Sequence, residues 1–209
     1  MHIPILLASL AIGLIFGVLL AKLGSGQISI NEKLYRGAIY AAAQDHKSAA
    51  VHFNKLTEKE ISKLKDDERK AVFQSHMLNN RYDQALEANP DGAEELIVHL
   101  AGKGNIQMVK NINSTLVPIK YEKAFLQKRY KAVLSLKNDV EMTERRQQQI
   151  VEALIMTGDV KGAVKFAKAY KLGHMRFEME RHFEKYVQEG RTTEAQQADG
   201  YAQISKMEE

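Results

Sequence analysis

The sequence predicts an all-α protein in which an N-terminal transmembrane helix is followed by an irregular α-solenoid of about six helix pairs. Two patterns carry this prediction: an uncharged apolar run near the N-terminus, and apolar residues that recur every three or four positions after residue 30. The composition agrees, since the soluble part is rich in good helix formers and the chain has three prolines and no tryptophan. We therefore expect almost no β-strand.

The first expected element is a transmembrane anchor helix over residues 1–23. From Ile3 to Ala21 the chain carries no charge. At about 1.5 Å per residue this run nearly spans a hydrocarbon core of about 30 Å. A cleavable signal peptide is the main alternative, but only Met1 and His2 precede the run, so the basic segment that begins such peptides is missing.

Charge and small residues give the expected anchor a direction and a packing face. The nearest basic residues all follow it, which predicts a single-pass protein of the cell (inner) membrane with its N-terminus outside and its C-terminal domain in the cytoplasm. These basic residues are Lys22, Lys33 and Arg36. Small residues recur every four positions, where a second copy or another membrane protein could approach closely. This stripe consists of Ser9, Gly13, Gly17 and Ala21.

A short flexible linker, residues 24–30, is expected to lead into a helical domain over residues 31–209. The linker contains Gly24-Ser25-Gly26. Ser29 with Glu32 has the S-x-x-E spacing of a helix start. Further helix starts are predicted at Thr57 with Glu60, at Asp91 with Glu94, and at Thr143.

The expected turns share a pattern. A Gly, Asn or Gln at the turn is followed five positions later by a small or β-branched residue, which we expect where the two antiparallel helices of a pair come closest. Successive small residues lie about 23 to 36 positions apart, a loose period close to that of helix-pair repeats. The pairs are Gln44/Ala49, Asn80/Ala85, Gly104/Val109, Gln127/Ala132, Gly158/Ala163 and Gly190/Ala195.

These turns resemble those of the tetratricopeptide repeat (TPR) family. The segment from Asn80 to Leu86 resembles the family's G-x-Y-x-x-A-L turn with Asn in place of Gly. The resemblance implies a TPR-like solenoid with a concave face that binds a protein partner. A compact helical bundle is the alternative. The residues that carry the resemblance are Gly37, Tyr40, Ala49, Phe53, Tyr82, Ala85, Gly158, Ala163, Gly190 and Ala195.

The overall plan is similar to that of bacterial membrane-anchored tetratricopeptide proteins, which have an N-terminal anchor and cytoplasmic repeats. Their cysteine-based metal module is missing, because this chain has no cysteine. The resemblance therefore implies a class: a membrane-tethered adaptor or scaffold that binds a protein partner during complex assembly, and that joins a membrane complex through its anchor.

No motif predicts an active site. His174, Glu178 and His182 lie four apart on one helix face, but successive members are too far apart to reach one metal ion comfortably, so we interpret them as a solvated face. The sequence has no G-x-x-x-x-G-K and no G-x-S-x-G motif. We expect no catalysis, cofactor, metal or small-molecule substrate. The alternative is an enzyme whose site is assembled from distant helices.

Charge is segregated along the chain. Residues 103–137 carry eight basic residues and one acid, Glu122, whereas residues 83–95 carry five acids and no base. One interpretation is ordinary charge on exposed helix faces. The other is a basic surface that meets anionic lipid heads or an acidic partner. A nucleic-acid partner is not expected at a net charge of +4. The cations assigned to such a surface are Lys120, Lys123, Lys128, Arg129 and Lys131.

Overall fold

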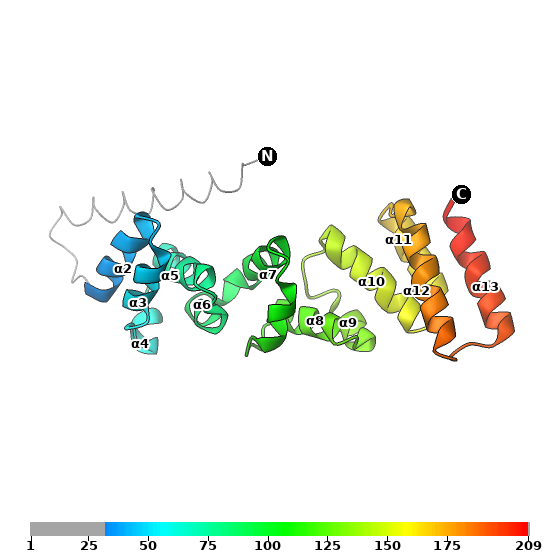
Figure 1. Cartoon of the computed structure of the whole chain (residues 1–209), viewed down its shortest axis with the longest axis horizontal. Helices are drawn as coiled ribbons and strands as arrows, with labels where there is room; N and C mark the ends of the chain where they lie inside the picture. Colours follow the sequence, from blue (N-terminus) through cyan, green and yellow to red (C-terminus); the bar gives the residue numbers. More distant parts are fainter. Residues whose placement is uncertain (1–31, 209) are drawn as a thin grey trace. The chain divides into compact units, whose positions relative to one another are not determined.

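The computed structural model of the chain describes residues 32–208, and these are helical, with no β-strand among them (Figure 1). The α-helices are α2 (Glu32–Ala42), α3 (His46–Phe53), α4 (Glu58–Ile61), α5 (Asp66–Leu78), α6 (Tyr82–Ala88), α7 (Ala93–Gly102), α8 (Val117–Leu126), α9 (Tyr130–Leu136), α10 (Glu144–Met156), α11 (Val160–Ala169), α12 (Arg176–Gln188) and α13 (Glu194–Ser205). Short 3-10 helices are η1 (Pro90–Gly92), η2 (Ile106–Asn111), η3 (Gly173–Met175) and η4 (Lys206–Glu208).

The membrane part of the predicted fold is corrected. No helix within residues 32–208 combines the length and the apolar character needed to cross a membrane. The longest of these helices, such as α10, have 13 residues, whereas a crossing needs about 20. The predictions of a single-pass membrane protein, its orientation and its inner-membrane location are therefore corrected for residues 32–208, which contain no spanning helix. The anchor was predicted from the hydropathy of one run, and its orientation from the basic residues that follow this run.

Several predicted features fall outside the described residues. They are the anchor at 1–23, the linker at 24–30 and the small-residue stripe of Ser9, Gly13, Gly17 and Ala21.

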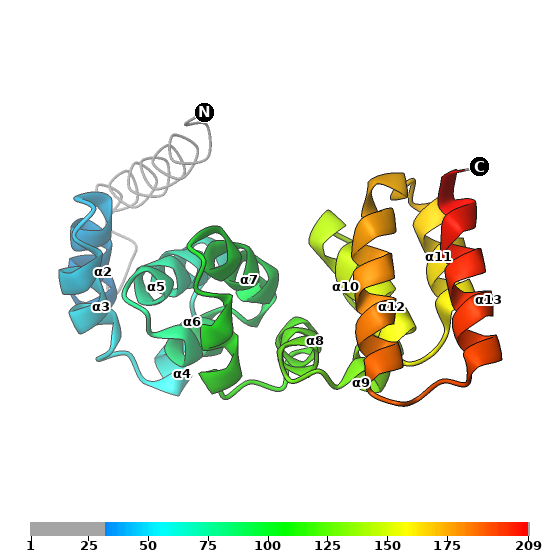
Figure 2. The same cartoon turned by 45° about the vertical axis from the view of Figure 1, so that its right-hand side comes forward.

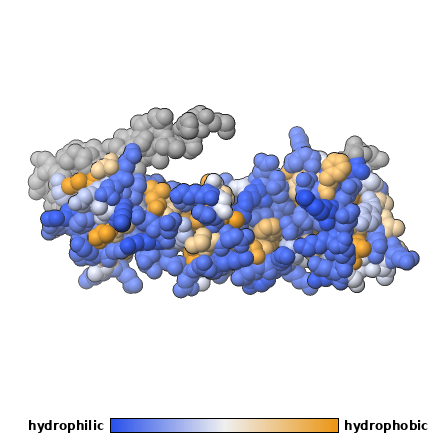
Figure 3. Space-filling view, viewed as in Figure 1, coloured by the Kyte–Doolittle hydropathy of each residue, from blue (hydrophilic) through white to orange (hydrophobic). Residues whose placement is uncertain are grey.

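The described residues, which fall within the repeat domain expected over 31–209, divide into two compact units. The first unit comprises residues 32–106 with Ile112–Ser114, and the second comprises Gln107–Asn111 with residues 115–208. In the first unit, α2 packs on α3 and α5 packs on α6 (Figure 1). In the second, α8 packs on α9, and α10 to α13 pack against one another (Figure 2). The visible face of each unit is mostly hydrophilic, with small hydrophobic patches (Figure 3).

Tight turns with one residue in the left-handed region join many of these helices. In six of them the next residue's amide donates back to a carbonyl five positions earlier, as Arg129 does to Ala124 over 2.8 Å. This Schellman bond satisfies a carbonyl at the helix end. The left-handed residues are Gln44, Asn80, Gly104, Lys128, Gly158, Lys171 and Gly190. The structure thus places the fourth expected turn at Lys128 instead of Gln127, and adds Lys171.

The small residue after the turn is buried in four of the six pairs, whereas Ala132 is half-buried and the assignment of Ala195 is corrected. Ala195 is exposed. Thr193 caps α13 by accepting a hydrogen bond from the Gln196 amide, so the helix begins later than the pattern implied. Gly200 lies against the Phe183 ring instead, where a Cβ would collide with it. The buried residues are Ala49, Ala85, Val109 and Ala163, together with Val133 in place of the half-buried Ala132.

Candidate anionic-partner site

Three of the five predicted cations line one pocket in the second unit. Lys128 and Arg129 lie in the turn between α8 and α9, and Lys131 lies in the first turn of α9. The pocket has a volume of about 670 Å³. Lys120 and Lys123, on α8, do not line it. Of the predicted surface, the cations after α8 line the pocket and those on α8 do not.

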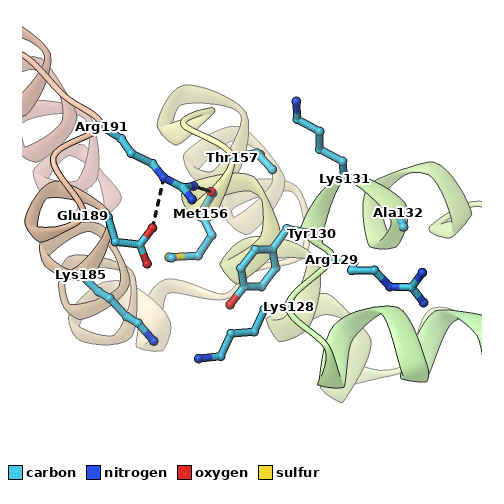
Figure 4. A pocket seen from close by; sticks show the side chains of 10 residues that line it. All are labelled: Lys128, Arg129, Tyr130, Lys131, Ala132, Met156, Thr157, Lys185, Glu189 and Arg191. Atoms are coloured by element: carbon cyan, nitrogen blue, oxygen red, sulfur yellow. Dashed lines mark hydrogen bonds and ion pairs between the residues drawn. The ribbon is translucent and has the colours of Figure 1, made fainter. Parts of the chain in front are cut away.

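Two further cations reach the same pocket from the C-terminal part of the unit. Lys185 lies in the last turn of α12, and Arg191 follows this helix. Figure 4 shows them on one side, with Lys128 and Arg129 on the other and Met156 and Tyr130 between. Lys185 and Arg191 were not predicted, because more than 50 residues separate them from Lys131 and no local sequence pattern indicates the contact. The remaining lining residues are Ala132, Thr157 and Glu189.

The pocket has a strong excess of positive charge. Five of its lining residues are cations and one, Glu189, is an acid. That acid pairs with Arg191, whose Nε lies 3.2 Å from its Oε2. Within residues 32–208 no ion pair is found for Lys128, Arg129, Lys131 or Lys185. Four exposed cations therefore surround the pocket without a carboxylate of their own.

Arg191 is held in place by three contacts. Besides Glu189, its Nη1 donates to the Met156 carbonyl at 3.4 Å, and its guanidinium lies 5.7 Å from the Tyr186 ring centroid. The Met156 carbonyl belongs to the last turn of α10, where a cation offsets the negative end of the helix dipole. Arg191 is thus a fixed part of the pocket wall.

Tyr130 fixes the other wall. Its ring is buried, and its hydroxyl donates to Glu152 Oε1 at 2.8 Å. Burial raises the pKa of the phenol above its ordinary value, and Glu152 raises it further, so the hydroxyl stays protonated. The Phe125 ring packs edge-on at 6.5 Å. These contacts, with the Schellman bond of Arg129, hold the turn that carries Lys128 and Arg129 in one conformation.

Glu152 also faces His182. His182 Nε2 lies 3.8 Å from Glu152 Oε2. Burial lowers the pKa of this imidazole, and Glu152 partly opposes that effect. The helix face of His174, Glu178 and His182 does not assemble as a metal site, since no group of three or more such ligands occurs among the described residues.

The single acid of the basic segment, Glu122, is paired within a buried network. Its carboxylate is fully buried and accepts two hydrogen bonds from Arg145, both of 2.7 Å, and one from Gln149 at 3.2 Å. Arg146 lies 3.7 Å from the same carboxylate and 5.3 Å from the Tyr121 ring centroid. This network joins α8 to α10 and does not reach the pocket lining. Glu122 therefore leaves the pocket's charge unopposed.

The residues that carry the TPR resemblance are dispersed and form no common site. In the first unit, Gly37 lies against the Phe53 ring, and the Tyr82 hydroxyl donates to Asn80 Oδ1 at 2.8 Å. Tyr40 is 38% exposed and stacks on His52 with centroids 5.3 Å apart, so it is outside the core.

In the second unit, Gly158 lies against the Tyr186 hydroxyl, and a Cβ there would collide with it. Ala163 is fully buried. These residues shape helix crossings and turns.

Comparisons of this chain with protein-family models, with curated proteins and with solved structures gave no match. The TPR resemblance consequently rests on the residues themselves.

Proposed function

We propose that this chain is a protein-binding helical module, an adaptor whose second unit binds an acidic segment of a partner protein. The observation that carries the proposal is the cationic pocket, defined as the cavity lined by Lys128, Arg129, Lys131, Lys185 and Arg191. Its only carboxylate is already paired. Clustered cations of this kind raise the rate of encounter with an anionic partner and select against basic ones.

The shape of the pocket favours a protruding segment over a flat lipid surface. Tyr130 and Met156 lie between the two cationic walls and offer apolar contact at the base (Figure 4). A bilayer presents its anionic charges at a flat surface. A partner's side chains can reach into the cavity. We therefore favour the acidic-partner form of this activity over the lipid form.

The test is binding of a fluorescent Glu-rich peptide to the full chain, followed by anisotropy. The wild-type chain should bind the peptide at low salt. Its affinity should fall steeply as salt is added, because the cations are exposed. The double variant Lys131→Glu, Lys185→Glu should weaken binding by about tenfold or more. The matched control, Lys161→Glu with Lys165→Glu on α11, has the same net charge and changes two exposed lysines outside the pocket.

Two results would overturn the proposal. One is an equal loss of affinity in the control variant, which would mean that net charge decides binding. The other is binding to vesicles of anionic lipid without binding to the peptide.

A further inference from the structure

An exposed acidic helix face in the first unit matches the cationic pocket in chemistry. Asp91 in η1 and Glu95 and Val98 in α7 are spaced i, i+4 and i+7, so they share one side of this helical stretch. All three are exposed. Val98 is 64% exposed, although it stands in the most apolar part of the helix. Residues 83–95, which include both acids, contain no base.

The two surfaces are complementary in two respects. Carboxylates from the acidic face would meet the four cations that have no ion pair within the described residues. The apolar side chain of Val98 would meet Met156 and Ala132, which line the pocket. Helices dock in grooves through apolar anchors, and acidic motifs bind clusters of cations, so a helix face with both features fits this pocket.

We infer that the acidic partner is a second copy of this chain, which inserts the Asp91–Glu95–Val98 face into the cationic pocket of its neighbour. This inference rests on the proposed function, and names the partner for that same pocket. The two contacting surfaces differ, so the contact is heterologous. A pair joined in this way leaves one pocket and one face free, so assembly can continue head to tail, giving a ring where the rotation between copies closes and a filament where it does not.

The test is sedimentation velocity of the full chain over a range of concentrations and salt. The weight-average mass should rise with concentration at low salt and return towards the monomer at high salt. Glu95→Lys should weaken self-association by about tenfold. Glu58→Lys is the matched control, because Glu58 is also an exposed acid in the first turn of a helix.

Charge exchange identifies the surfaces directly. A copy with Glu95→Lys and a copy with Lys131→Glu and Lys185→Glu should each remain smaller than the wild type when alone. Mixing them should give a one-to-one pair, since the unchanged acidic face of the second copy fits the unchanged pocket of the first.

The inference fails if the wild-type chain is monomeric at low salt, or if mixing gives no pair. A chain that stays monomeric yet binds the Glu-rich peptide would overturn this inference and leave the proposed function standing. A chain that self-associates equally in all variants would also contradict it.

Discussion

At the scale of single residues, glycines at helix crossings set how closely two helices pack. Gly37 of α2 faces the Phe53 ring of α3, and a Cβ at that position would collide with the ring. The sequence marked Gly37 and Phe53 through their spacing. It could not show that one lies directly on the other, because that depends on how α2 crosses α3.

Replacing Gly37 with Ala should therefore destabilise the first unit. We expect a loss of about 1 to 3 kcal/mol, because the buried ring must move to admit the methyl group. Gly102→Ala is the control: Gly102 lies in the last turn of α7 with no atom near its Cβ position, so Ala should be neutral or stabilise by up to about 1 kcal/mol. Urea denaturation measures both. Equal urea midpoints for the two variants would contradict the close contact between Gly37 and the Phe53 ring.

The buried His76 should make the first unit sensitive to acid. Burial, with Arg81 nearby, lowers the pKa of this imidazole from 6.5 to about 4. Between these values the unfolded chain binds a proton that the folded chain does not. The free energy of unfolding should thus be at its full value above about pH 6.5 and fall by up to about 3 kcal/mol as the pH drops to about 4.

His76→Gln removes this titration, so the loss of stability between about pH 7 and about pH 5 should shrink relative to the wild type. His174→Gln, at an exposed histidine of η3 in the second unit, is the matched substitution for comparison. The measurement is the urea midpoint at each pH. An unchanged slope in His76→Gln would refute the assignment.

Turn residues show where sequence reasoning succeeds and where it stops. Gln44, Asn80 and Gly158 were predicted at turns and adopt positive φ. Lys128 was missed, because a long β-unbranched cation has no preference for the left-handed region. It is held there by the Arg129 amide, which donates to Ala124. The position of the turn was set by hydrogen bonding that residue type does not reveal.

At the scale of elements, helix starts with a capping side chain were predictable. Thr57 and Glu60 form a reciprocal capping box, and the Thr143 hydroxyl accepts from the Arg146 amide. The start expected at Asp91 differs, since Pro90–Gly92 forms a 3-10 turn and α7 begins at Ala93. The caps at Thr57 and Thr143 depend on hydrogen bonds between residues three apart, so the sequence predicted them. The 3-10 turn at Pro90–Gly92 was not predicted.

The contacts between helices could not be predicted from the sequence. Glu122 is the one acid among residues 103–137, and it is the buried centre of the network that joins α8 to α10. Glu122→Gln should cost about 3 to 5 kcal/mol in the second unit, because it leaves buried guanidinium charge without its counter-charge. Glu184→Gln, at an exposed site on α12, should change stability by less than about 0.5 kcal/mol. Comparable losses in thermal denaturation would show that the network contributes little.

At the scale of the whole molecule, the helical class followed from composition and periodicity, and residues 32–208 are helical. Hydropathy of one run measures local transfer free energy, and no helix in the described part of the chain has the length for a crossing. Three of the five cations that line the pocket were predicted from the sequence. Lys128, Arg129 and Lys131 are neighbours in sequence, but Lys185 and Arg191 join them only through the packing of α12 beside α10.

The central claim is that an acidic protein segment occupies the cationic pocket. The most direct test is zero-length carbodiimide cross-linking of the Glu-rich peptide to the full chain, with mass spectrometry of the linked lysines. We predict cross-links at Lys128, Lys131 and Lys185 that disappear at high salt. Cross-links spread equally over Lys161 and Lys165 on α11 would contradict the claim.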